Sequence, residues 1–455
     1  MPHIAVVGSG PGGVYTAQSL VQQTLLPDVR VDVLDRLPCP YGLVRYGVAP
    51  DHEKIKSLQG TLRAVLQDER VRFLGGVEVG PALPPSTLLE LYDAVVYCVG
   101  AAADRRLGVP GEDLPGSWSA TDFVAWYSAH PDARDDGFVR GVRTAVAIGV
   151  GNVAVDVVRM LVRGAAELTR TDMPQAALGV LAASEVRDVY MVGRRGPAQA
   201  RFTTKELREL GSLPDTDIVV DEAELALDAG YRDPAALPGA VRRNVAVLRS
   251  WADRPHRGGA HRIHLRFFLR PVAIVEGGGR VAGVRFERTA PDGLGGVGGT
   301  GRYEEIGAQL VLRSVGYRGV PLAGLPFDAV SGTVPQAAGR VLREGRVSPG
   351  EYVAGWIKRG PTGVIGTNRP CAKETVTSLL TDLGALTPGP DPAPGRPDPL
   401  AGLIAAGARP VEWAGWQAIE RAEAALGGSL GRGSVKIADW AGLLDAARDA
   451  HEATG

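Results

Sequence analysis

The first hundred residues alternate between short apolar runs and stretches with helical spacing. Ile4 to Val7 is a β-branched run that ends in a glycine-rich turn, and Val14 to Gln23 repeats its apolar residues with a helical period. A second apolar run, Val31 to Leu34, ends at the acid Asp35. This order predicts a strand, a helix and a second parallel strand, which together form a β-α-β unit.

The same order of elements begins again in the middle of the chain. The pattern predicts a strand at Ala145 to Ile148, a helix at Asn152 to Val162 and a strand at Val189 to Val192. Two such units in one chain form an internal repeat. We therefore expect an α/β fold with two dinucleotide-binding, Rossmann-like domains. The first is expected to be discontinuous, with residues 1–103 and 318–455 flanking an inserted domain of residues 104–317.

The remaining segments fill out these two domains. A helix is expected at His52 to Gln67, and the later strands are expected at Leu265 to Phe268, Val281 to Phe286, Gln309 to Val315 and Tyr352 to Gly355. Residues 163–184 read as an excursion before the last strand of the second unit. The proline-rich residues 387–399 read as a stiff connector to two C-terminal helices, Val411 to Leu426 and Ile437 to Ala447.

Composition narrows the class of protein. The 50 basic and 51 acidic residues nearly cancel, so no overall field attracts nucleic acid or an anionic membrane. No apolar stretch reaches the ~20 residues of a membrane helix, and a cytoplasmic location is expected. The three cysteines, Cys39, Cys98 and Cys371, form no C-x-x-C pair and are too few for a four-cysteine iron–sulfur cluster, so no metal site is expected.

The first glycine-rich turn has the context of a dinucleotide site. Glycine makes up 61 of 455 residues, so a bare G-x-G-x-x-G spacing is expected about once by chance, and only its context is informative. Here the turn follows a strand and opens a helix: Gly8 would make the tight turn, Gly10 would admit the pyrophosphate, and Gly13 would let helix and strand pack. Asp35, at the end of the next strand, would accept hydrogen bonds from the hydroxyls of an adenosine ribose.

The second turn is followed by the opposite charge. Ala154 replaces the third glycine, and Arg194 and Arg195 stand where the first unit has its acid. Guanidinium groups at this position favour the 2′-phosphate of NADP, which an acid would repel. The first unit therefore suits FAD and the second NADP(H), although a solvated arginine pair is the alternative.

Longer strings resemble a known family. They are residues 37–52, LPCPYGLVRYGVAPDH, residues 151–159, GNVAVDVVR, residues 193–197, GRRGP, and residues 355–368, GWIKRGPTGVIGTN. Together with the glycine turns they make the chain similar to adrenodoxin reductase and its bacterial NADPH-ferredoxin reductase relatives over nearly its full length. The resemblance implies an FAD-dependent ferredoxin-NADP⁺ reductase, which takes a hydride from NADPH and passes single electrons to a ferredoxin.

The resemblance also implies cofactor contacts. FAD contacts are expected from Gly12, Asp35, Leu43, Val79 and Arg105, with Trp356, Gly363, Val364 and Ile365 covering the isoalloxazine ring. Val150, Gly151, Asn152 and Val153 are expected to hold the NADP pyrophosphate, and Arg194, Arg195 and Glu206 its adenosine end. Asp35 departs from the Glu common among relatives, and Gly12 from their usual Ala.

Three residues are candidates for catalysis. His52 is the one histidine inside a family-like string, and with Glu209 it is expected to assist proton handling or docking near the flavin; capping of the following helix is the alternative. Asp156 lies on the predicted NADP helix and is expected near the nicotinamide, unless it is an ordinary helix acid.

The electron acceptor is expected to be an acidic ferredoxin, which would serve a haem monooxygenase indirectly. Such a partner needs a basic surface. The candidates, which an ordinary solvated face would explain equally well, are Lys205, Arg208, Arg242, Arg243, Arg249, Arg254 and Arg257. Two other readings stay open: a flavin monooxygenase or disulfide reductase, and an electron-transfer subunit of a larger complex.

Overall fold

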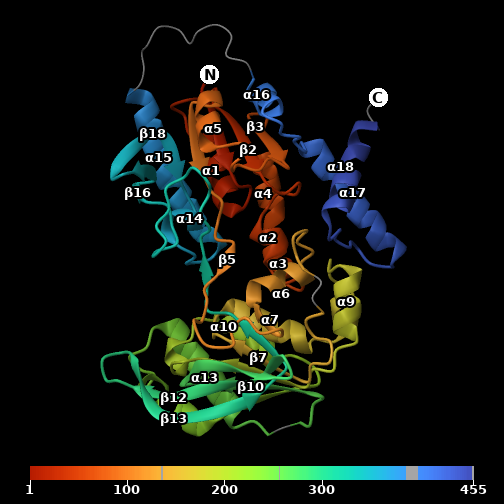
Figure 1. The fold of residues 1–455 in the computed structure, drawn as a ribbon, viewed down its shortest axis with the longest axis vertical. Coiled ribbons are helices and arrows are strands. Elements are labelled where there is room, and N and C mark those ends of the chain that lie inside the picture. Colours follow the sequence, from red (N-terminus) through yellow and green to blue (C-terminus); the bar gives the residue numbers. More distant parts are fainter. Residues whose placement is uncertain (135–136, 256, 386–397, 453–455) are drawn as a thin grey trace. The chain divides into compact units, whose positions relative to one another are not determined.

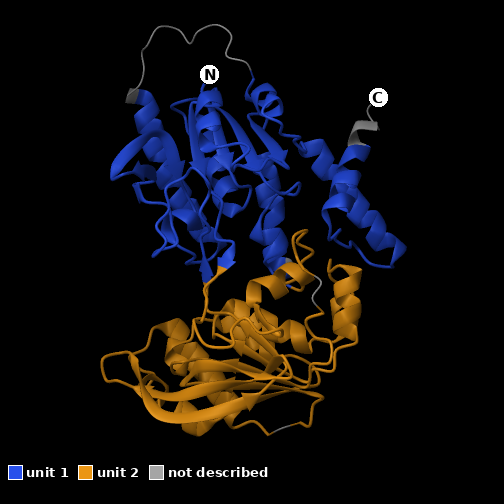
Figure 2. Ribbon diagram, in the orientation of Figure 1, with its two compact units in different colours: residues 1–48, 52–103, 317–455 blue, residues 49–51, 104–316 orange. Residues whose placement is uncertain are grey.

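The computed structural model describes residues 1–134, 137–255, 257–385 and 398–452, so most of the expected connector lies outside the described residues. Two compact units divide the chain (Figure 2). Unit 1 comprises residues 1–48, 52–103 and 317–455, and unit 2 comprises residues 49–51 and 104–316. The crossings fall in β5 (Ala103–Asp104) and just before β15 (Tyr317–Arg318). Which cofactor each unit binds stays a prediction.

Unit 1 is built on a seven-stranded sheet in the order β16-β17-β18-β4-β1-β2-β3 (Figure 1). The five strands from β18 to β3 are parallel. At the other end of the sheet β17 is antiparallel to β18, and the edge strand β16 is antiparallel to β17. Their bounds are β1 His3–Val7, β2 Arg30–Asp35, β3 Val71–Gly75, β4 Ala94–Tyr97, β16 Gln336–Ala337, β17 Arg340–Arg343 and β18 Arg346–Val353.

Both faces of this sheet are buried, which explains the unbroken apolar runs of its strands. On β1, Ile4 and Val6 point into one core and Ala5 and Val7 into the other. The first core is closed by helices α1 Pro11–Gln22, α4 Leu58–Leu66, α15 Asn368–Ala385, α17 Trp413–Ser429 and α18 Trp440–Glu452. The second is closed by α5 Pro85–Leu91 and α16 Pro399–Ala405.

Unit 2 has a six-stranded parallel sheet in the order β6-β14-β7-β8-β10-β9. The strands are β6 Ser117–Ser119, β7 Thr144–Ile148, β8 Asp188–Val192, β9 Thr216–Val220, β10 His261–Arg266 and β14 Leu310–Arg313. One face carries α6 Ala120–Tyr127, α7 Asn152–Val162, α9 Gln175–Ala182, α10 Thr204–Gly211 and α13 Gly239–Ala252.

An antiparallel sheet covers the other face of unit 2. It consists of β11 Leu269–Gly277, β12 Arg280–Pro291 and β13 Val297–Gly307. Phe286 and Ile306 from this sheet pack against Val146 and Val192 of the parallel sheet. The short helices of unit 2 are α8 Ala165–Leu168, α11 Glu222–Leu225 and α12 Ala229–Arg232.

The expected α/β fold with two Rossmann-like units is confirmed, and the repeat extends to single hydrogen bonds. Gly8 donates its N–H to the Leu34 carbonyl over 2.7 Å, and Gly149 donates in the same way to Val192 over 2.9 Å. The expected excursion at residues 163–184 holds α8 and α9. Among the described residues no helix is long and apolar enough to cross a bilayer.

The helix expected at residues 52–67 was wrong in one respect, because it is two helices. They are α3 Glu53–Lys56 and α4 Leu58–Leu66. Between them the Ser57 hydroxyl donates to the Lys54 carbonyl over 2.8 Å, which is the local bond through which serine competes with a continuous helix. The C-terminal pair was placed correctly in order, but both helices begin and end a few residues later than expected.

Candidate functional site

At Gly8 and Gly13 the first glycine turn is closed by backbone contacts that leave no room for a side chain. A Cβ on Gly8, which has φ +110°, would lie 2.6 Å from the Cys98 carbonyl oxygen, and one on Gly13 would lie 1.7 Å from the Gly8 oxygen. A Cβ on Gly12 would lie 3.4 Å from the Cα of Gly355, which precedes α14 (Trp356–Arg359). The turn leads directly into the N-terminus of α1. Because its backbone can be approached closely, the free backbone amides of that helix end can bind a pyrophosphate.

Asp35 ends β2 beside this turn, as the spacing predicts. Its carboxylate accepts hydrogen bonds from the Ser9 N–H (2.8 Å), the Ser9 hydroxyl (2.5 Å) and the Leu37 N–H (2.9 Å). Burial raises the pKa of Asp35 above its usual value, against the opposing effect of these donors. A carboxylate offers about four lone-pair positions, so three donors leave room for about one ribose hydroxyl rather than two.

The segment expected to cover the flavin has unsatisfied and exposed groups that fit an aromatic ligand. The indole N–H of Trp356 is buried without a hydrogen-bond partner among the described residues. Val364 is 65% exposed, so its side chain is accessible to a ligand. Leu43, in α2 (Leu43–Tyr46), is half-buried, whereas Val79 lies within the second core of the unit. Trp356 and Val364 are compatible with a bound isoalloxazine ring, and the FAD contacts of all four residues stay predictions.

The second glycine turn is open at its centre. A Cβ on Gly149 would lie 2.1 Å from the Ser314 carbonyl oxygen, but one on Gly151 would meet nothing within 4 Å. Asn152 opens α7 and accepts a hydrogen bond from the Thr203 N–H over 2.8 Å, and Val150 accepts one from the Arg201 N–H over 2.8 Å. The helix start is thus bound to a second loop and keeps free space in front of it, which fits a phosphate ligand.

Three arginines surround this turn. Arg194 and Arg195 follow β8, and their carbonyls accept hydrogen bonds from Thr289 and Phe268, which fixes their backbone. Arg194 and Arg201 are exposed and Arg195 is half-buried, and none of the three guanidinium groups has a partner among the described residues. Unpaired guanidinium groups beside a helix N-terminus fit the phosphates of NADP.

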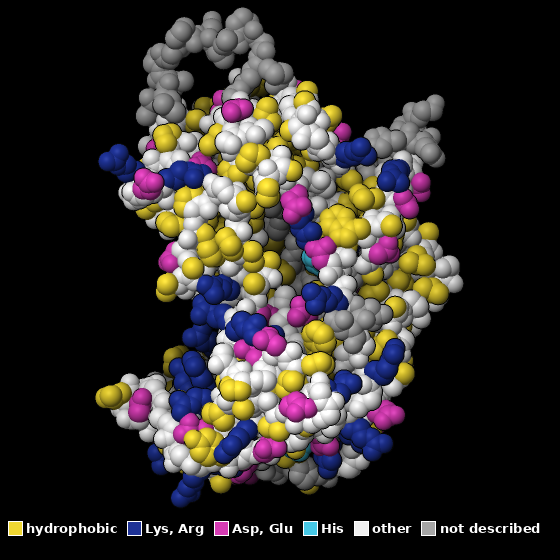
Figure 3. All heavy atoms as spheres, in the orientation of Figure 1, with side chains coloured by type: hydrophobic (Ala, Val, Ile, Leu, Met, Phe, Trp, Pro, Cys, Tyr) yellow, Lys and Arg dark blue, Asp and Glu magenta, His cyan; other side chains and the backbone are white. Residues whose placement is uncertain are grey.

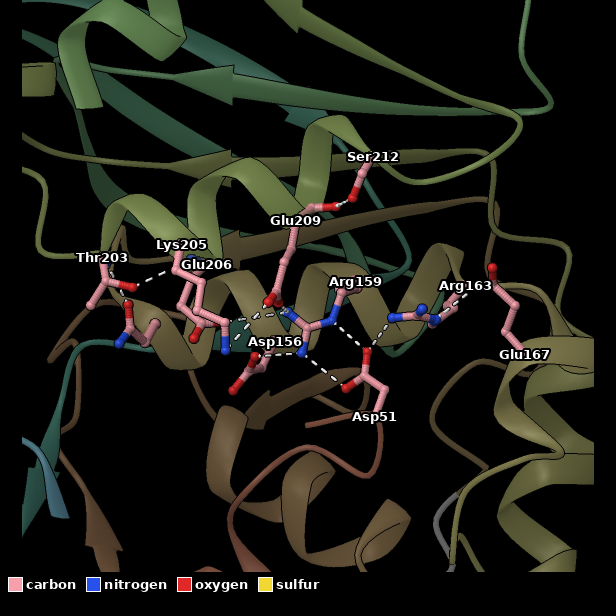
Figure 4. A network of polar contacts seen from close by, with 11 residues as sticks. Asp51, Asp156, Arg159, Arg163, Glu167, Thr203, Lys205, Glu206, Glu209 and Ser212 are labelled. Atoms are coloured by element: carbon pink, nitrogen blue, oxygen red, sulfur yellow. Dashed lines mark hydrogen bonds and ion pairs between the residues drawn. The ribbon is translucent and has the colours of Figure 1, made fainter. Parts of the chain in front are cut away.

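A buried arginine on α7 contacts four acidic side chains of unit 2 (Figure 4). Arg159 is 1% exposed and donates to Asp51 over 2.7 and 3.0 Å and to Asp156 over 2.8 Å. Glu209, on α10, lies 3.3 Å from Arg159, and Glu206 lies 3.7 Å from it. Despite burial, these carboxylates raise the pKa of Arg159 above its usual value.

The predicted roles of three acids have to be read against this cluster. Asp156, Glu206 and Glu209 were expected at the nicotinamide, the adenosine end and the flavin, respectively, yet each faces Arg159. Arg163, the residue that caps the C-terminus of α7, pairs with Asp51 and Glu167. The described cluster therefore brings the three acids together in unit 2, and their roles toward the cofactors stay predictions.

The structure assigns His52 and Arg105 to different units. The His52 carbonyl accepts hydrogen bonds from Ile55 and Lys56, each 3.0 Å, so its backbone begins α3, and its side chain is buried. Arg105 lies in unit 2, where its N–H donates to the Gly316 carbonyl over 2.9 Å. The catalytic role of His52 and the FAD contact of Arg105 stay predictions.

Lys and Arg side chains gather along one side of unit 2 (Figure 3). Of the docking candidates, Lys205 and Arg208 on α10 and Arg242 and Arg243 on α13 are exposed, and these two helices pack together. A surface hollow of about 390 Å³ between them is lined partly by Val247 and Trp251.

Two of the other candidates are engaged inside the unit. Arg249 donates to the carbonyls of Tyr231 and Arg232, and Arg254 donates to that of Gly211. They are weaker docking candidates than the exposed residues, which also include Arg257.

Sequence reasoning missed several residues of these sites. Ser9 donates hydrogen bonds to Asp35, and Arg201 borders the second turn. Arg159 and Asp51 form the centre of the acidic cluster. The i, i+3 spacing of Asp156 and Arg159 on a predicted helix could have predicted their ion pair. The others are brought together only by the tertiary fold.

Fold and sites define a class of protein: an oxidoreductase with two dinucleotide sites, one bordered by a carboxylate and one by arginines. The sequence matches no family model. It is 47% identical to NADPH-ferredoxin reductase FprA of Mycobacterium tuberculosis, covering 97% of this chain and 98% of that one. It is also 38% identical to the mitochondrial NADPH:adrenodoxin oxidoreductase of Arabidopsis thaliana, covering 98% and 95%.

A solved structure agrees with these relatives. Mycobacterium tuberculosis FprA in complex with NADPH superposes with a TM-score of 0.92 at 46% identity, covering 98% of this chain and 99% of that one. The chain belongs to the family of NADPH-ferredoxin reductases that includes adrenodoxin reductase.

Proposed function

We propose that this chain is an NADPH-ferredoxin reductase that binds FAD in unit 1 and NADPH in unit 2. The observation that carries the proposal is the opposite charge that follows two equivalent strands. Asp35 ends β2 in unit 1, whereas Arg194 and Arg195 follow β8 in unit 2. A carboxylate accepts bonds from a free ribose hydroxyl, and guanidinium groups favour an esterified one.

The residues of unit 1 would hold FAD in an extended form. The α1 N-terminus with Gly10 and Gly12 would bind the pyrophosphate, Asp35 the ribose, and Trp356 with residues 363–365 the isoalloxazine. When bound, FAD supplies a group that accepts a hydride from NADPH and releases electrons singly. Gly355, Gly360 and Gly363 have positive φ values, which fits a loop shaped for a close backbone approach to the ring.

Unit 2 would orient the nicotinamide nucleotide. Gly151, Asn152 and the α7 N-terminus would bind the pyrophosphate, with Arg201 beside them, and Arg194 and Arg195 would bind the 2′-phosphate. Asp156 and Glu209 would act near the reacting ends, with the buried Arg159 as their counter-charge. His52 would hold or release a proton at its imidazole during the redox cycle.

The partner would be an acidic ferredoxin bound at the exposed Lys205, Arg208, Arg242 and Arg243. A haem monooxygenase would be served through that ferredoxin, and the reaction would take place in the cytoplasm. A disulfide reductase is disfavoured because the sequence has no C-x-x-C pair.

The test is electron transfer by the full chain reconstituted with FAD. NADPH should support rapid reduction of a ferredoxin, followed through cytochrome c, with little hydroxylation of added substrates. Oxygen-dependent hydroxylation, or bleaching of the flavin without turnover in the presence of ferredoxin, would instead favour a monooxygenase or a subunit of a larger complex.

A further inference from the structure

A buried ion pair joins helix α17 to helix α2, which directly follows the Tyr41–Gly42 turn. Arg45 and Glu423 are each 4% exposed, and Arg45 donates to Glu423 over 2.6 and 3.2 Å. Glu423 also accepts the Ile437 N–H over 2.9 Å, and the buried Lys436 donates to the Arg45 carbonyl over 2.6 Å. The loss of either partner should be strongly destabilising, because the remaining charge would be buried without a counter-charge and without water.

Aromatic rings complete this contact. The Arg45 guanidinium lies 5.0 Å from the ring centroids of both Trp416 and Tyr46. Tyr41 meets Trp416 edge to face, with ring centroids 5.9 Å apart and ring planes 84° apart. Trp416 is 1% exposed and Tyr41 is fully buried, so α17 packs tightly against the Tyr41 side chain.

The turn before α2 has an unusual backbone. Tyr41 has φ +83°, a left-handed conformation that costs a non-glycine residue free energy and persists only where its surroundings enforce it. Its N–H donates to the Ser9 carbonyl over 3.1 Å. A Cβ on Gly42 would lie 2.9 Å from the Cα of Gly10. The strained Tyr41–Gly42 turn is thus pressed directly against the first glycine turn.

We propose that Glu423 and Trp416 are positioning residues for the flavin site: through Arg45 and Tyr41, helix α17 holds the Tyr41–Gly42 turn, and so Ser9 and Gly10, in the FAD-binding shape. The inference rests on the proposed function of unit 1. Helix α17 would thus help to retain the cofactor. It would also help to position Asp35, because Ser9 donates two hydrogen bonds to that carboxylate. Relaxation of the turn would release its strain and uncouple these donors.

The experiment compares the full-length wild-type chain with Glu423→Gln, Trp416→Phe and the matched control Asp382→Asn. Asp382 accepts hydrogen bonds from Arg340 over 2.7 and 2.8 Å and from the Tyr352 hydroxyl over 2.8 Å, so its partners among the described residues lie outside the Tyr41–Gly42 turn. Three quantities are measured: the dissociation constant of FAD, the melting temperature, and hydrogen exchange in the apoprotein over residues 40–48. The exchange measurement reports on the turn without FAD.

In Glu423→Gln and Trp416→Phe we expect faster exchange over residues 40–48 and FAD binding weaker by about tenfold, the size of effect that a strain of this kind can carry. In Asp382→Asn both quantities should stay within about twofold of wild type even where the melting temperature falls equally. Trp416→Phe keeps an aromatic ring in the core and leaves no unpaired buried charge, so it tests the proposal if Glu423→Gln does not fold.

Wild-type FAD affinity in both α17 variants, or equal weakening in Asp382→Asn, would overturn the proposal and leave the proposed function intact. A wild-type chain that takes up no FAD would instead overturn the proposed function of unit 1, and the role of Glu423 in flavin binding with it.

Discussion

Asp51 accepts two hydrogen bonds from the buried guanidinium of Arg159, over 2.7 and 3.0 Å, across 108 residues of sequence. The same arginine lies within 3.7 Å of Asp156, Glu206 and Glu209. One enclosed cation therefore contacts four carboxylates, which it shares with two more exposed cations, Arg163 at Asp51 and Lys205 at Glu209.

Arg159→Met should destabilise unit 2 strongly. Removing the cation leaves buried carboxylates in mutual repulsion, and we expect the free energy of unfolding to fall by about 3–5 kcal/mol. Arg163→Met is the matched control, since that side chain is 26% exposed and should cost about 1 kcal/mol or less. Urea denaturation followed by circular dichroism measures both, and equal losses would contradict the central place of Arg159.

The arginines around the second glycine turn should separate two kinds of phosphate contact. Arg194→Ala with Arg195→Ala should weaken NADPH by roughly 10- to 150-fold and leave NADH nearly unchanged, because only NADPH carries the 2′-phosphate. Arg201→Ala should weaken NADPH and NADH alike, because both have the pyrophosphate. The dissociation constants of NADPH and NADH measure both effects. If the Arg194 and Arg195 double variant lost equal affinity for the two nucleotides, these arginines would not bind the 2′-phosphate.

The sequence could predict the sheets and the glycine turns because both depend on local patterns. Helix α7 occupies the expected residues 152–162, since strands buried on both faces and an amphipathic helix each leave a periodic trace. The Arg159–Asp51 and Arg45–Glu423 pairs leave no such trace, because their partners are 108 and 378 residues apart. The break at Ser57 was equally invisible, since it depends on one hydroxyl bond within an otherwise helical pattern.

The Arg72–Asp398 pair should give a pH-dependent stability. Hydrogen bonds from the Arg72 guanidinium lower the pKa of Asp398 to about 2, from 3.8. The folded pKa lies below the unfolded one, so the contribution is complete above about pH 4 and is lost as the pH falls towards 2. Asp398 is 55% exposed, which keeps the contribution below about 1 kcal/mol.

Asp398→Asn isolates this charge, because Asn can still accept the Leu400 N–H at the start of α16. The variant should melt below wild type at pH 6, and the difference should shrink between pH 4 and pH 2.5. Thermal melting at several pH values measures it. A difference that stays constant over this range would show that packing, rather than charge, ties residue 398 to β3.

Asp35→Asn tests the carboxylate of the flavin site. The change removes the charge that Ser9 and Leu37 hydrogen-bond, and we expect FAD to bind about tenfold or more weakly. Since burial raises the pKa of Asp35, wild-type affinity should also fall as the pH drops through that raised value, whereas the variant's affinity should not change there. Titrating FAD fluorescence between pH 4 and 8 measures both effects, and parallel pH curves would contradict the assignment.

The basic face of α10 and α13 should control ferredoxin binding but not the reaction with NADPH. Arg242→Glu with Arg243→Glu places acids where an acidic partner would dock, so we expect the KM for ferredoxin to rise about tenfold or more at low salt and to depend less on salt than in wild type. Arg280→Glu, an equally exposed charge reversal at the start of β12, is the control. Reduction of ferricyanide by NADPH, which needs no docking surface, should stay unchanged in both variants. If the double variant lost ferricyanide reduction as well, or if Arg280→Glu matched its effect on ferredoxin, the partner would not bind at these helices.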